Sequence, residues 1–355
     1  GSSGGGSGGG SGGGDGGGGS SGGGNGGGSG GGDGGGDGGG DGGGSDGDQS
    51  GVATGDGYSL SGYGVWFQDL SSSAEQFQIG DNKGFDSNAS GIVFGFDYPV
   101  RDGAATVGFA LSLNDSNVIS RGASASTTGI SAETYMLYGA HQLDSGSYLS
   151  GMMSYGRVTN SLSRTPVPGV TATAEQDAES YAISGEWGSS GILSLPNLGI
   201  PLAIDARTSI KTQLGYSMFD PEPYTETGAG GLNLTVTPER AKALTTGIQL
   251  AFEWDGKIDF TYNQNLGKNI DYTFGLYGGF SREWLNEKVG STSSFEAGGA
   301  PMETESQASD QNTLSLGTYT SFNVTDDITV DGGYEVTTKK EFISRSAFFK
   351  IRRQF

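Results

Sequence analysis

The chain ends in the stretch Arg345-Ser-Ala-Phe-Phe-Lys-Ile-Arg-Arg-Gln-Phe355, where apolar and polar side chains alternate up to an aromatic last residue. In an extended strand, successive side chains point to opposite faces. One face carries the apolar residues Ala347, Phe349, Ile351 and Phe355. The other face carries the polar residues Ser346, Lys350, Arg352 and Gln354. A strand with lipid on one side and water on the other has this pattern, which indicates a membrane-spanning β-barrel.

The composition excludes several other classes of protein. The 355 residues have a net charge of −21 and include 71 glycines but no cysteine. No apolar run reaches the roughly 18 to 20 residues that a membrane-spanning helix needs. The missing cysteines suit a chain that crosses an oxidising periplasm unfolded. The acidity and the lack of a basic stripe argue against a nucleic-acid partner. Because the chain shows no initiator Met and no signal peptide, we expect its export signal upstream of Gly1.

Composition also divides the chain into parts. Residues 1–50 are almost entirely Gly with Ser, Asp and Asn, and no apolar side chain is present to offset the entropy of ordering. We expect a disordered linker over 1–50, a lead-in or pore-traversing segment over 51–60, and a barrel over 61–355. A Gly-rich coil of this length spans roughly 40 Å, which exceeds the roughly 25 Å apolar height of an outer-membrane barrel. The Gly/Asp rhythm of 31–37 distantly resembles calcium-binding repeats, but its period of four favours a solvated linker.

From Tyr63 onward, short alternating segments follow one another. We expect strands over about 61–70, 89–98, 103–114, 130–141, 147–158, 178–188, 200–216, 241–254, 270–284, 311–322, 327–338 and 344–355. A spanning strand needs about nine to eleven residues, whereas strands of soluble sheets usually have five or six. The segments therefore predict an all-β fold, a 12-stranded antiparallel transmembrane barrel. A soluble β-sandwich is the alternative, but it fits poorly because the inward positions are small or polar and would make a poor dry core.

The connections between these segments alternate in length. Long polar connections are expected at 159–177, 220–240 and 285–310, and short turns at 99–102, 142–146 and 323–326. Outer-membrane barrels have long outer loops and short periplasmic turns, so the alternation places both barrel termini on the periplasmic side. Two connections break the rule, because 255–269 is long and 339–342 is short.

Several motifs occur in the order found in one known family. They are Gly64-Val-Trp-Phe-Gln68, Gly91-Ile-Val-Phe-Gly-Phe-Asp97, Tyr224-Thr-Glu-Thr-Gly228 with Gly231-Leu-Asn-Leu-Thr-Val236 and Leu244-Thr-Thr-Gly247, Phe280-Ser-Arg-Glu-Trp284, and Phe355. Together they resemble the translocator β-domain of autotransporters, the type V secretion proteins, over roughly residues 61–355. Two features depart from that family. Residues 49–60 lack the amphipathic period of the usual pore helix, and Arg353 stands at a third-last position that is usually apolar.

The resemblance implies an outer-membrane translocator or anchor that secretes or displays an N-terminal passenger, without a cofactor. It implies as partners the outer-membrane lipid and lipopolysaccharide, the barrel-assembly machinery, periplasmic chaperones and the chain's own passenger segment. The linker is then expected in the periplasm, in the pore or at the cell surface. Phe355, with Phe349 and Ile351 beside it, corresponds to the family's assembly signal.

The sequence offers little for catalysis, so we expect no enzyme. The only histidine is His141, expected in a turn away from the sites of hydrolytic barrels, and no metal set, nucleotide loop or catalytic carboxylate pair is present. Ionisable residues at inward positions are the candidate site residues of a hydrated lumen: Asp97, Glu186, Asp205, Arg207, Lys211, Glu253, Asp331 and Glu335. The alternative functions are a stand-alone outer-membrane channel or adhesin and, less favoured, an outer-membrane hydrolase.

Overall fold

A computed structural model describes residues 63–78, 84–121, 126–143, 146–191, 206–259, 269–285, 289–305 and 310–355. The expected linker over 1–50, the lead-in over 51–60 and the candidate lumen residue Asp205 lie outside these ranges.

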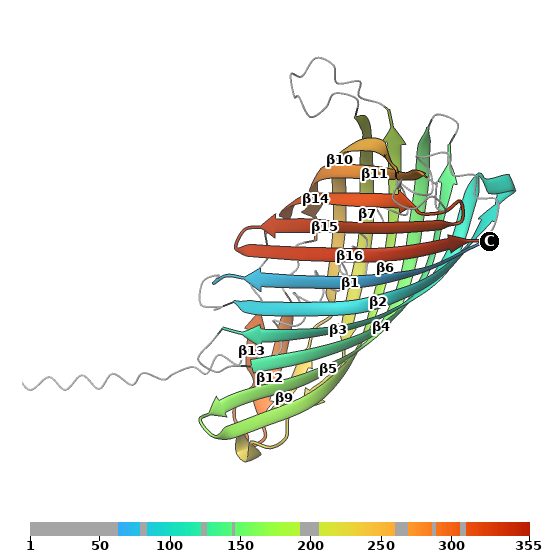
Figure 1. Cartoon of the computed structure of the whole chain (residues 1–355). Helices are drawn as coiled ribbons and strands as arrows, with labels where there is room; N and C mark the ends of the chain where they lie inside the picture. The colour runs from blue at the N-terminus through green and yellow to red at the C-terminus, as the bar shows by residue number, and fades with distance from the viewer. Residues whose placement is uncertain are drawn as a thin grey trace, which may run out of the picture.

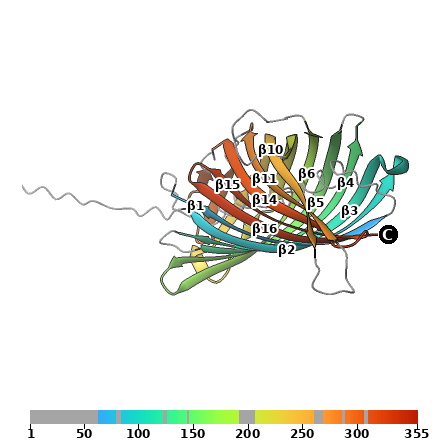
Figure 2. The same ribbon diagram turned by 45° about the horizontal axis from the view of Figure 1, so that its top comes forward.

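The described residues form a closed antiparallel barrel of twelve strands, which confirms the predicted fold class (Figure 1). Its strands are β1 (Gly64–Gln76), β2 (Phe85–Val100), β3 (Ala105–Ser120), β4 (Ser126–Gln142), β5 (Ser147–Val167), β6 (Val170–Ser190), β7 (Arg207–Pro221), β10 (Ala241–Asp259), β11 (Asn269–Glu283), β14 (Asn312–Asn323), β15 (Ile328–Lys339) and β16 (Phe342–Gln354). Figure 2 shows the labelled strands following one another around a single curved wall. No helix in the described ranges is long and apolar enough to cross a membrane.

The barrel closes between its first and last strands. Gly64 at the start of β1 lies opposite Gln354 at the end of β16, so both strand ends meet at one end of the barrel, which we call the terminal end (Figure 1). The short turns between β2 and β3, β4 and β5, and β14 and β15 lie at this end as well. We call the opposite end, which carries the β5–β6 turn and the excursions after β7 and β11, the loop end.

The strand register sets the tilt and width of the barrel. From Leu70, stepping between partners through β16, β15, β14, β11 and β10 leads to Arg207 on β7. Stepping the other way, through β2 to β6, leads to Pro221 on the same strand. Arg207 and Pro221 are 14 residues apart, and this offset is the shear of the barrel. Twelve strands with this shear tilt by about 40° and enclose a backbone cylinder about 22 Å across.

Side chains alternate between the two faces of the wall. Along β16, Phe349 and Ile351 are 46% and 41% exposed on the outer face, whereas Lys350 between them is only 1% exposed. Large apolar residues are exposed on the outer face of all twelve wall strands, for example Phe109, Leu214 and Leu316. In water such a surface would be costly, whereas lipid tails solvate it.

Three connections differ from their predictions. The segment 159–177 is not a loop, because β5 and β6 continue as a hairpin of 21 residues each, joined by a tight turn at Pro168 and Gly169. At about 3.4 Å per residue, strands of this length extend well beyond an apolar band of roughly 25 Å. The segments 220–240 and 285–310 contain a second sheet made of β8 (Tyr224–Thr225), β9 (Leu234–Pro238), β12 (Gly290–Phe295) and β13 (Met302–Glu305). We call it the loop sheet.

Candidate functional site: the barrel lumen and its mouth

A belt of charged and aromatic side chains lines the lumen near the terminal end. Its charged members are the acids Asp97, Glu186, Glu253 and Asp331 and the bases Arg207, Lys211, Lys350 and Arg352. Its aromatic members are Trp66, Tyr138, Tyr148, Tyr277 and Tyr319. Acids and bases are therefore mixed in this part of the lumen, although the whole chain carries a charge of −21.

Ion pairs and hydrogen bonds connect the belt across neighbouring strands. Arg352 Nη2 lies 2.7 Å from Asp97 Oδ1, and both side chains are nearly buried. Arg207 Nε donates to Glu253 Oε2 at 2.8 Å, and the hydroxyl of Tyr319 donates to the other oxygen of Glu253. These contacts tie β16 to β2 across β1 and tie β7 to β14 across β10 and β11. Paired in this way, buried charges avoid the cost of an unpaired ion.

The aromatic rings of the belt lie against glycines of adjacent strands. A Cβ added to Gly95 would come within 2.0 Å of the Trp66 ring, and a Cβ on Gly108 would come within 2.1 Å of Tyr138. Tyr148 covers Gly188 in the same manner, at 2.2 Å. Only glycine leaves room for a ring to lie flat on the wall at these positions, an arrangement that shields the exposed glycine backbone. The rings thus line the lumen without projecting across it.

The inner face of β1–β5 also carries an apolar cluster, which the expectation of a hydrated lumen missed. Trp66, Val93, Ala110 and Met136 are buried there, with Leu70, Tyr138 and Met152 packed against them. Indole Nε1 of Trp66 donates to the hydroxyl of Tyr138 at 2.9 Å, and Lys350 Nζ lies 5.3 Å from the indole centroid. The lumen wall is therefore partly packed at this level and is polar only between the packed groups.

Two polar atoms at the level of the belt have no described partner. Gln68 Nε2 and Asp331 Oδ2 are buried and make no hydrogen bond within the described residues. They lie in one cross-strand row, because Gln68 and Asp331 are both register partners of Lys350. One is a donor and the other an acceptor, and a buried polar atom without a partner costs about 1–3 kcal/mol.

Towards the loop end, the inner face becomes smaller and more polar. Its inward positions there carry Ser72, Asn114, Thr134, Ser154, Ser217, Ser315 and Thr337, among others. Short hydroxyl and amide side chains leave the wall smooth and wettable. The lumen therefore changes from a packed, charged belt to a polar vestibule.

The loop sheet packs on the inner face of the tall β5–β6 hairpin. Its strand order is β13-β12-β9-β8, and its core residues Tyr224, Leu234 and Val236 pack against Leu162 of β5 and Ala174 of β6. An isolated β-bridge between Thr173 and Thr227 continues the contact along β6. The two excursions thus fold towards the barrel axis at the mouth and are not free surface loops.

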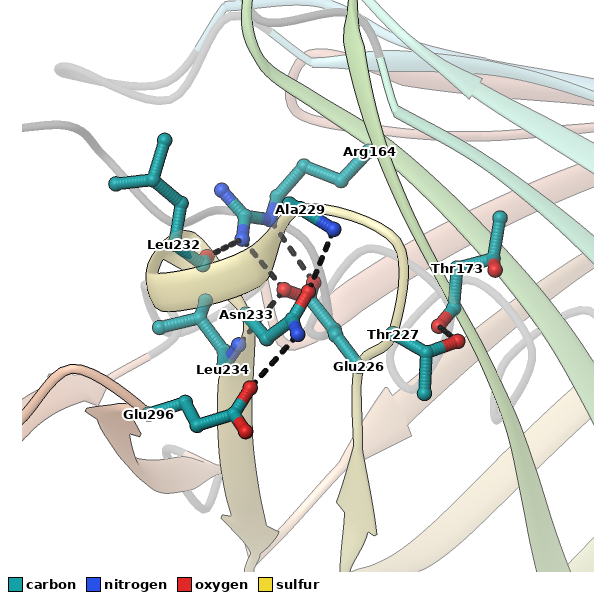
Figure 3. A network of polar contacts seen from close by, with 9 residues as sticks. All are labelled: Arg164, Thr173, Glu226, Thr227, Ala229, Leu232, Asn233, Leu234 and Glu296. Atoms are coloured by element: carbon teal, nitrogen blue, oxygen red, sulfur yellow. Dashed lines mark hydrogen bonds and ion pairs between the residues drawn. The ribbon is translucent and has the colours of Figure 1, made fainter.

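A buried ion pair fastens the loop sheet to the hairpin (Figure 3). Arg164 of β5 donates through Nε to Glu226 Oε1 at 2.9 Å and through Nη2 to the Leu232 carbonyl at 3.0 Å. Glu226 Oε2 also accepts the main-chain amide of Leu234 at 2.9 Å. Asn233 joins the two excursions, because its Nδ2 donates to Glu296 Oε2 at 2.8 Å. Every oxygen of the buried Glu226 carboxylate is therefore satisfied, as its burial requires.

Tyr224 lies inside the same small core. Burial is the main cause that raises the pKa of its phenol from an ordinary 10.0 to about 12, and the nearby Glu226 carboxylate adds to the shift. The neutral phenol is thus the form that the packed loop sheet accommodates.

The structure brings most of the expected lumen residues together and leaves some apart. Asp97, Glu186, Arg207, Lys211, Glu253 and Asp331 belong to the belt, Glu335 lies next to it on β15 and accepts a hydrogen bond from Thr337 Oγ1 at 3.0 Å, and Asp205 is outside the described residues. Lys350 and Arg352 were missed as site residues, although the alternation of the terminal strand already placed them on its polar face. Phe349, Ile351 and Phe355 lie on the outer face. Their role in assembly stays a prediction.

His141 lies at the terminal end of β4. Its Nδ1 is 2.9 Å from the carbonyl oxygen of Ala104, which lies in the turn between β2 and β3. In the described ranges, no group of three or more His, Cys, Asp or Glu side chains is arranged to hold a metal ion.

Comparison with known proteins agrees with this architecture. A sequence model of the autotransporter β-domain matches residues 65–335. Among solved structures, the translocator domain of the autotransporter NalP from Neisseria meningitidis is similar with a TM-score of 0.63 at 14% identity, covering 84% of this chain and 90% of that one. The β-domain of the Bordetella autotransporter BrkA gives 0.56 at 14% identity, with 83% and 100% covered. The transport unit of AIDA-I from Escherichia coli gives 0.55 at 10% identity, with 82% and 90% covered.

No curated protein sequence matches the chain. The three structures share its fold at low identity, whereas the family model covers most of the chain, including nearly all of the motifs between β1 and β11. The resemblance read from those motifs is confirmed. The chain belongs to the autotransporter β-domain family, and its barrel is an outer-membrane translocator and anchor domain.

Proposed function

We propose that this barrel secretes or displays a passenger carried on its N-terminal side, with the Gly-rich segment 1–50 as the connection. The terminal end faces the periplasm and the loop end faces the outside. Residues 51–60 lead into the barrel or run through its pore. The linker rests in the periplasm, in the pore or at the cell surface, depending on the stage of transport.

The main support is where the N-terminal chain meets the barrel. Tyr63 stands at the terminal end, where its carbonyl accepts the amide of Phe355 at 2.9 Å, directly below the belt that contains Trp66. A chain that leaves Tyr63 towards the lumen passes the charged and aromatic side chains of the belt next. Many of the belt's charges are already paired with one another, so they hold such a chain weakly.

The inner width of the barrel is suited to the passage of the linker. A cylinder about 22 Å across, less the side chains on its inner face, leaves room for extended chain or about one helix. A segment of Gly, Ser, Asp and Asn has small side chains and no fold to undo before it passes. We propose that this step needs no cofactor.

The remaining partners belong to the same proposal. The barrel-assembly machinery recognises the last strand with Phe355, periplasmic chaperones hold the chain before insertion, and outer-membrane lipid and lipopolysaccharide surround the apolar band. We also propose that the barrel catalyses no reaction. The only histidine in the sequence, His141, points its Nδ1 at a turn carbonyl and lies near the terminal end.

Single cysteines can test the orientation and the path, because the natural chain has none. We would place one cysteine in the linker (Ser45→Cys), one on the exposed face of the loop sheet (Thr292→Cys) and one in the β14–β15 turn (Asp326→Cys) of the full chain. Intact cells are treated with a maleimide that cannot cross the outer membrane, and permeabilised cells serve as the reference.

The proposal predicts that Thr292→Cys labels on intact cells and that Asp326→Cys labels only after permeabilisation. Ser45→Cys should label on intact cells once a passenger is displayed. Labelling of Asp326→Cys but not Thr292→Cys would reverse the orientation. If Ser45→Cys needs permeabilisation in every state while Thr292→Cys does not, the arm never crosses the pore, and the channel or adhesin alternative holds.

A further inference from the structure

The outer face of the barrel at its loop end has an uneven charge. Strands β2–β6 carry an arc of acids there: Asp86, Asp115, Glu133, Glu175, Asp177 and Glu179. The same arc has only the bases Arg121 and Arg157. On β10 and β11 the sign is opposite, because the outward positions at the loop end are Lys242 and Arg282. Both of these side chains are exposed.

The two bases begin where the apolar band ends. Outward residues of β10 run from Trp254 through Phe252, Leu250 and Ile248 to Leu244, and Lys242 follows. On β11 they run from Phe274 through Leu276 to Phe280, and Arg282 follows. Trp284 comes directly after β11 on the same side and is 53% exposed. We call Lys242, Arg282 and Trp284 the basic patch.

The basic patch is held in place without its charges being neutralised. The Arg282 guanidinium carbon lies 4.9 Å from the Trp284 ring centroid, and Trp284 Nε1 donates to Thr246 Oγ1 at 2.8 Å. Arg282 Nη2 donates to the uncharged Gln311 side chain at 3.2 Å. Within the described ranges, no carboxylate pairs with Lys242 or Arg282. By contrast, Arg240 pairs with Asp220, and Arg121 pairs with Asp86 and Glu75.

We infer that the basic patch binds the phosphate groups of the lipid A headgroup of lipopolysaccharide. Charge complementarity selects this occupant, because two unpaired cations at the border of the apolar band face the level at which lipid phosphates lie. An indole at that level anchors a barrel at the membrane interface, and a guanidinium binds phosphate oxygens in a fork geometry. The assignment of this leaflet to lipopolysaccharide rests on the proposed orientation, with the loop end outside.

The acidic arc predicts on which side of the barrel lipid A binds. Its carboxylates repel the same phosphates, so lipid A bound without a bridging cation should concentrate over β10 and β11. The barrel then carries tightly held lipid on one side of its circumference and exchanges lipid freely on the other.

The test compares the full chain with Lys242→Gln/Arg282→Gln, purified from outer membranes in mild detergent. Arg121→Gln/Arg157→Gln is the matched control, because it removes the same charge from the outer face of the acidic arc. Lipid A retained by each barrel is measured by native mass spectrometry in the presence of a chelator. Heat-modifiable migration in electrophoresis verifies that each variant is folded.

We expect the patch variant to retain at least about tenfold less lipid A than the natural chain, since each base contributes about 1 kcal/mol at a charged surface. The control should retain the natural amount. Dephosphorylated lipid A should be retained weakly by all three proteins, and inorganic phosphate at millimolar concentration should not displace intact lipid A. Equal retention by the natural chain and the folded patch variant would overturn the inference, as would equal retention of dephosphorylated lipid A.

The outcome is separable from that of the proposed function. Cysteine labelling of the linker should be unchanged in the patch variant, because the patch faces outward and the path lies in the lumen. Loss of lipid A with normal linker labelling supports the inference alone. Reversed labelling of the loop sheet and the β14–β15 turn would leave a phosphate-binding patch but assign it to the inner leaflet, which would overturn lipopolysaccharide as its occupant.

Discussion

Tyr63 and Phe355 stack on each other at the terminal end, with ring centroids 5.1 Å apart and an angle of 16° between the rings. The amide of Phe355 donates to the Tyr63 carbonyl at 2.9 Å, which adds one hydrogen bond beyond the last register pair of β1 and β16. The guanidinium of Arg353 lies 4.8 Å from the same Phe355 ring. The first and last residues of the barrel therefore close the seam together, by contacts that neither strand can make alone.

Deletion of Phe355 is expected to lower the amount of folded barrel in the outer membrane without lowering synthesis or export. The deletion removes both the ring stack and the final hydrogen bond of the seam, and an aromatic group at the interface is lost with it. Quantitative immunoblotting of heat-modifiable barrel, at low expression, measures the effect. Phe355→Tyr is the control and should restore assembly. A natural level of barrel from the deletion would show that Phe355 is no part of an assembly signal.

Arginine at Leu214 should impair the barrel, and arginine at Gln213 should be tolerated. The two residues are neighbours on β7, but Leu214 is 54% exposed on the outer face whereas the Gln213 side chain faces the lumen beside Gly247. A charge facing lipid costs roughly 2–4 kcal/mol near the midplane, whereas a lumen charge meets water. Urea unfolding in lipid vesicles measures both variants. Similar losses at the two sites would mean that the faces are assigned wrongly.

Arg164→Ala is expected to loosen the loop sheet while leaving the barrel closed. The change leaves the Glu226 carboxylate, whose side chain is only 7% exposed, without its charged partner. Loss of one partner of a buried ion pair costs about 3–5 kcal/mol. Hydrogen exchange of residues 224–238 should rise, and exchange of β1 and β16 should not.

The double variant Arg164→Leu/Glu226→Leu serves as the control for that experiment. It removes both charges, so it should recover much of the protection because no buried charge is left unpaired. Equal loss of protection in the single and double variants would show that the ion pair does not fasten the sheet.

The loop sheet should also weaken at high pH. The pKa of Tyr224 is raised from 10.0 to about 12, so its contribution to stability is complete below pH 10 and is lost as the pH rises through 12. Protease cleavage in 222–240, measured between pH 8 and 12 with a correction for protease activity, should rise over that window. Tyr224→Phe keeps the ring without an ionisable group, so its cleavage should lack this rise. The same pH dependence in both proteins would assign the effect to another group.

The sequence predicted the spanning parts of the fold well because lipid imposes a simple rule. Each wall strand must show apolar residues outward, so alternation is preserved in segments such as those that contain Phe109 and Leu214. The rule ends where the lipid ends. Residues 159–177 form strand but face water or the loop sheet, so their polar composition looked like a loop.

The loop sheet was beyond prediction for a different reason. Strand β8 has two residues and β9 has five, and the partner of β9 is β12, far along the chain. Such short segments carry no periodic signal of their own, and their pairing depends on the barrel that brings them together. The belt was predicted only in part, since inward acids and bases can be read from parity, whereas the pairing of Arg352 with Asp97 follows from closure of the barrel.

The pairing in the loop sheet also has a consequence for the order in which the chain folds. Leu234 pairs with Phe295, and between them the chain must first lay down β10 and β11 as adjacent wall strands. A contact that spans two complete strands forms late, because the entropy of closing so long a loop is offset only after the wall exists. Until then, the inner face of the β5–β6 hairpin stays uncovered. The loop sheet can therefore cover the hairpin only after β10 and β11 stand in the wall, and the mouth is the part of the barrel that depends on strands already formed.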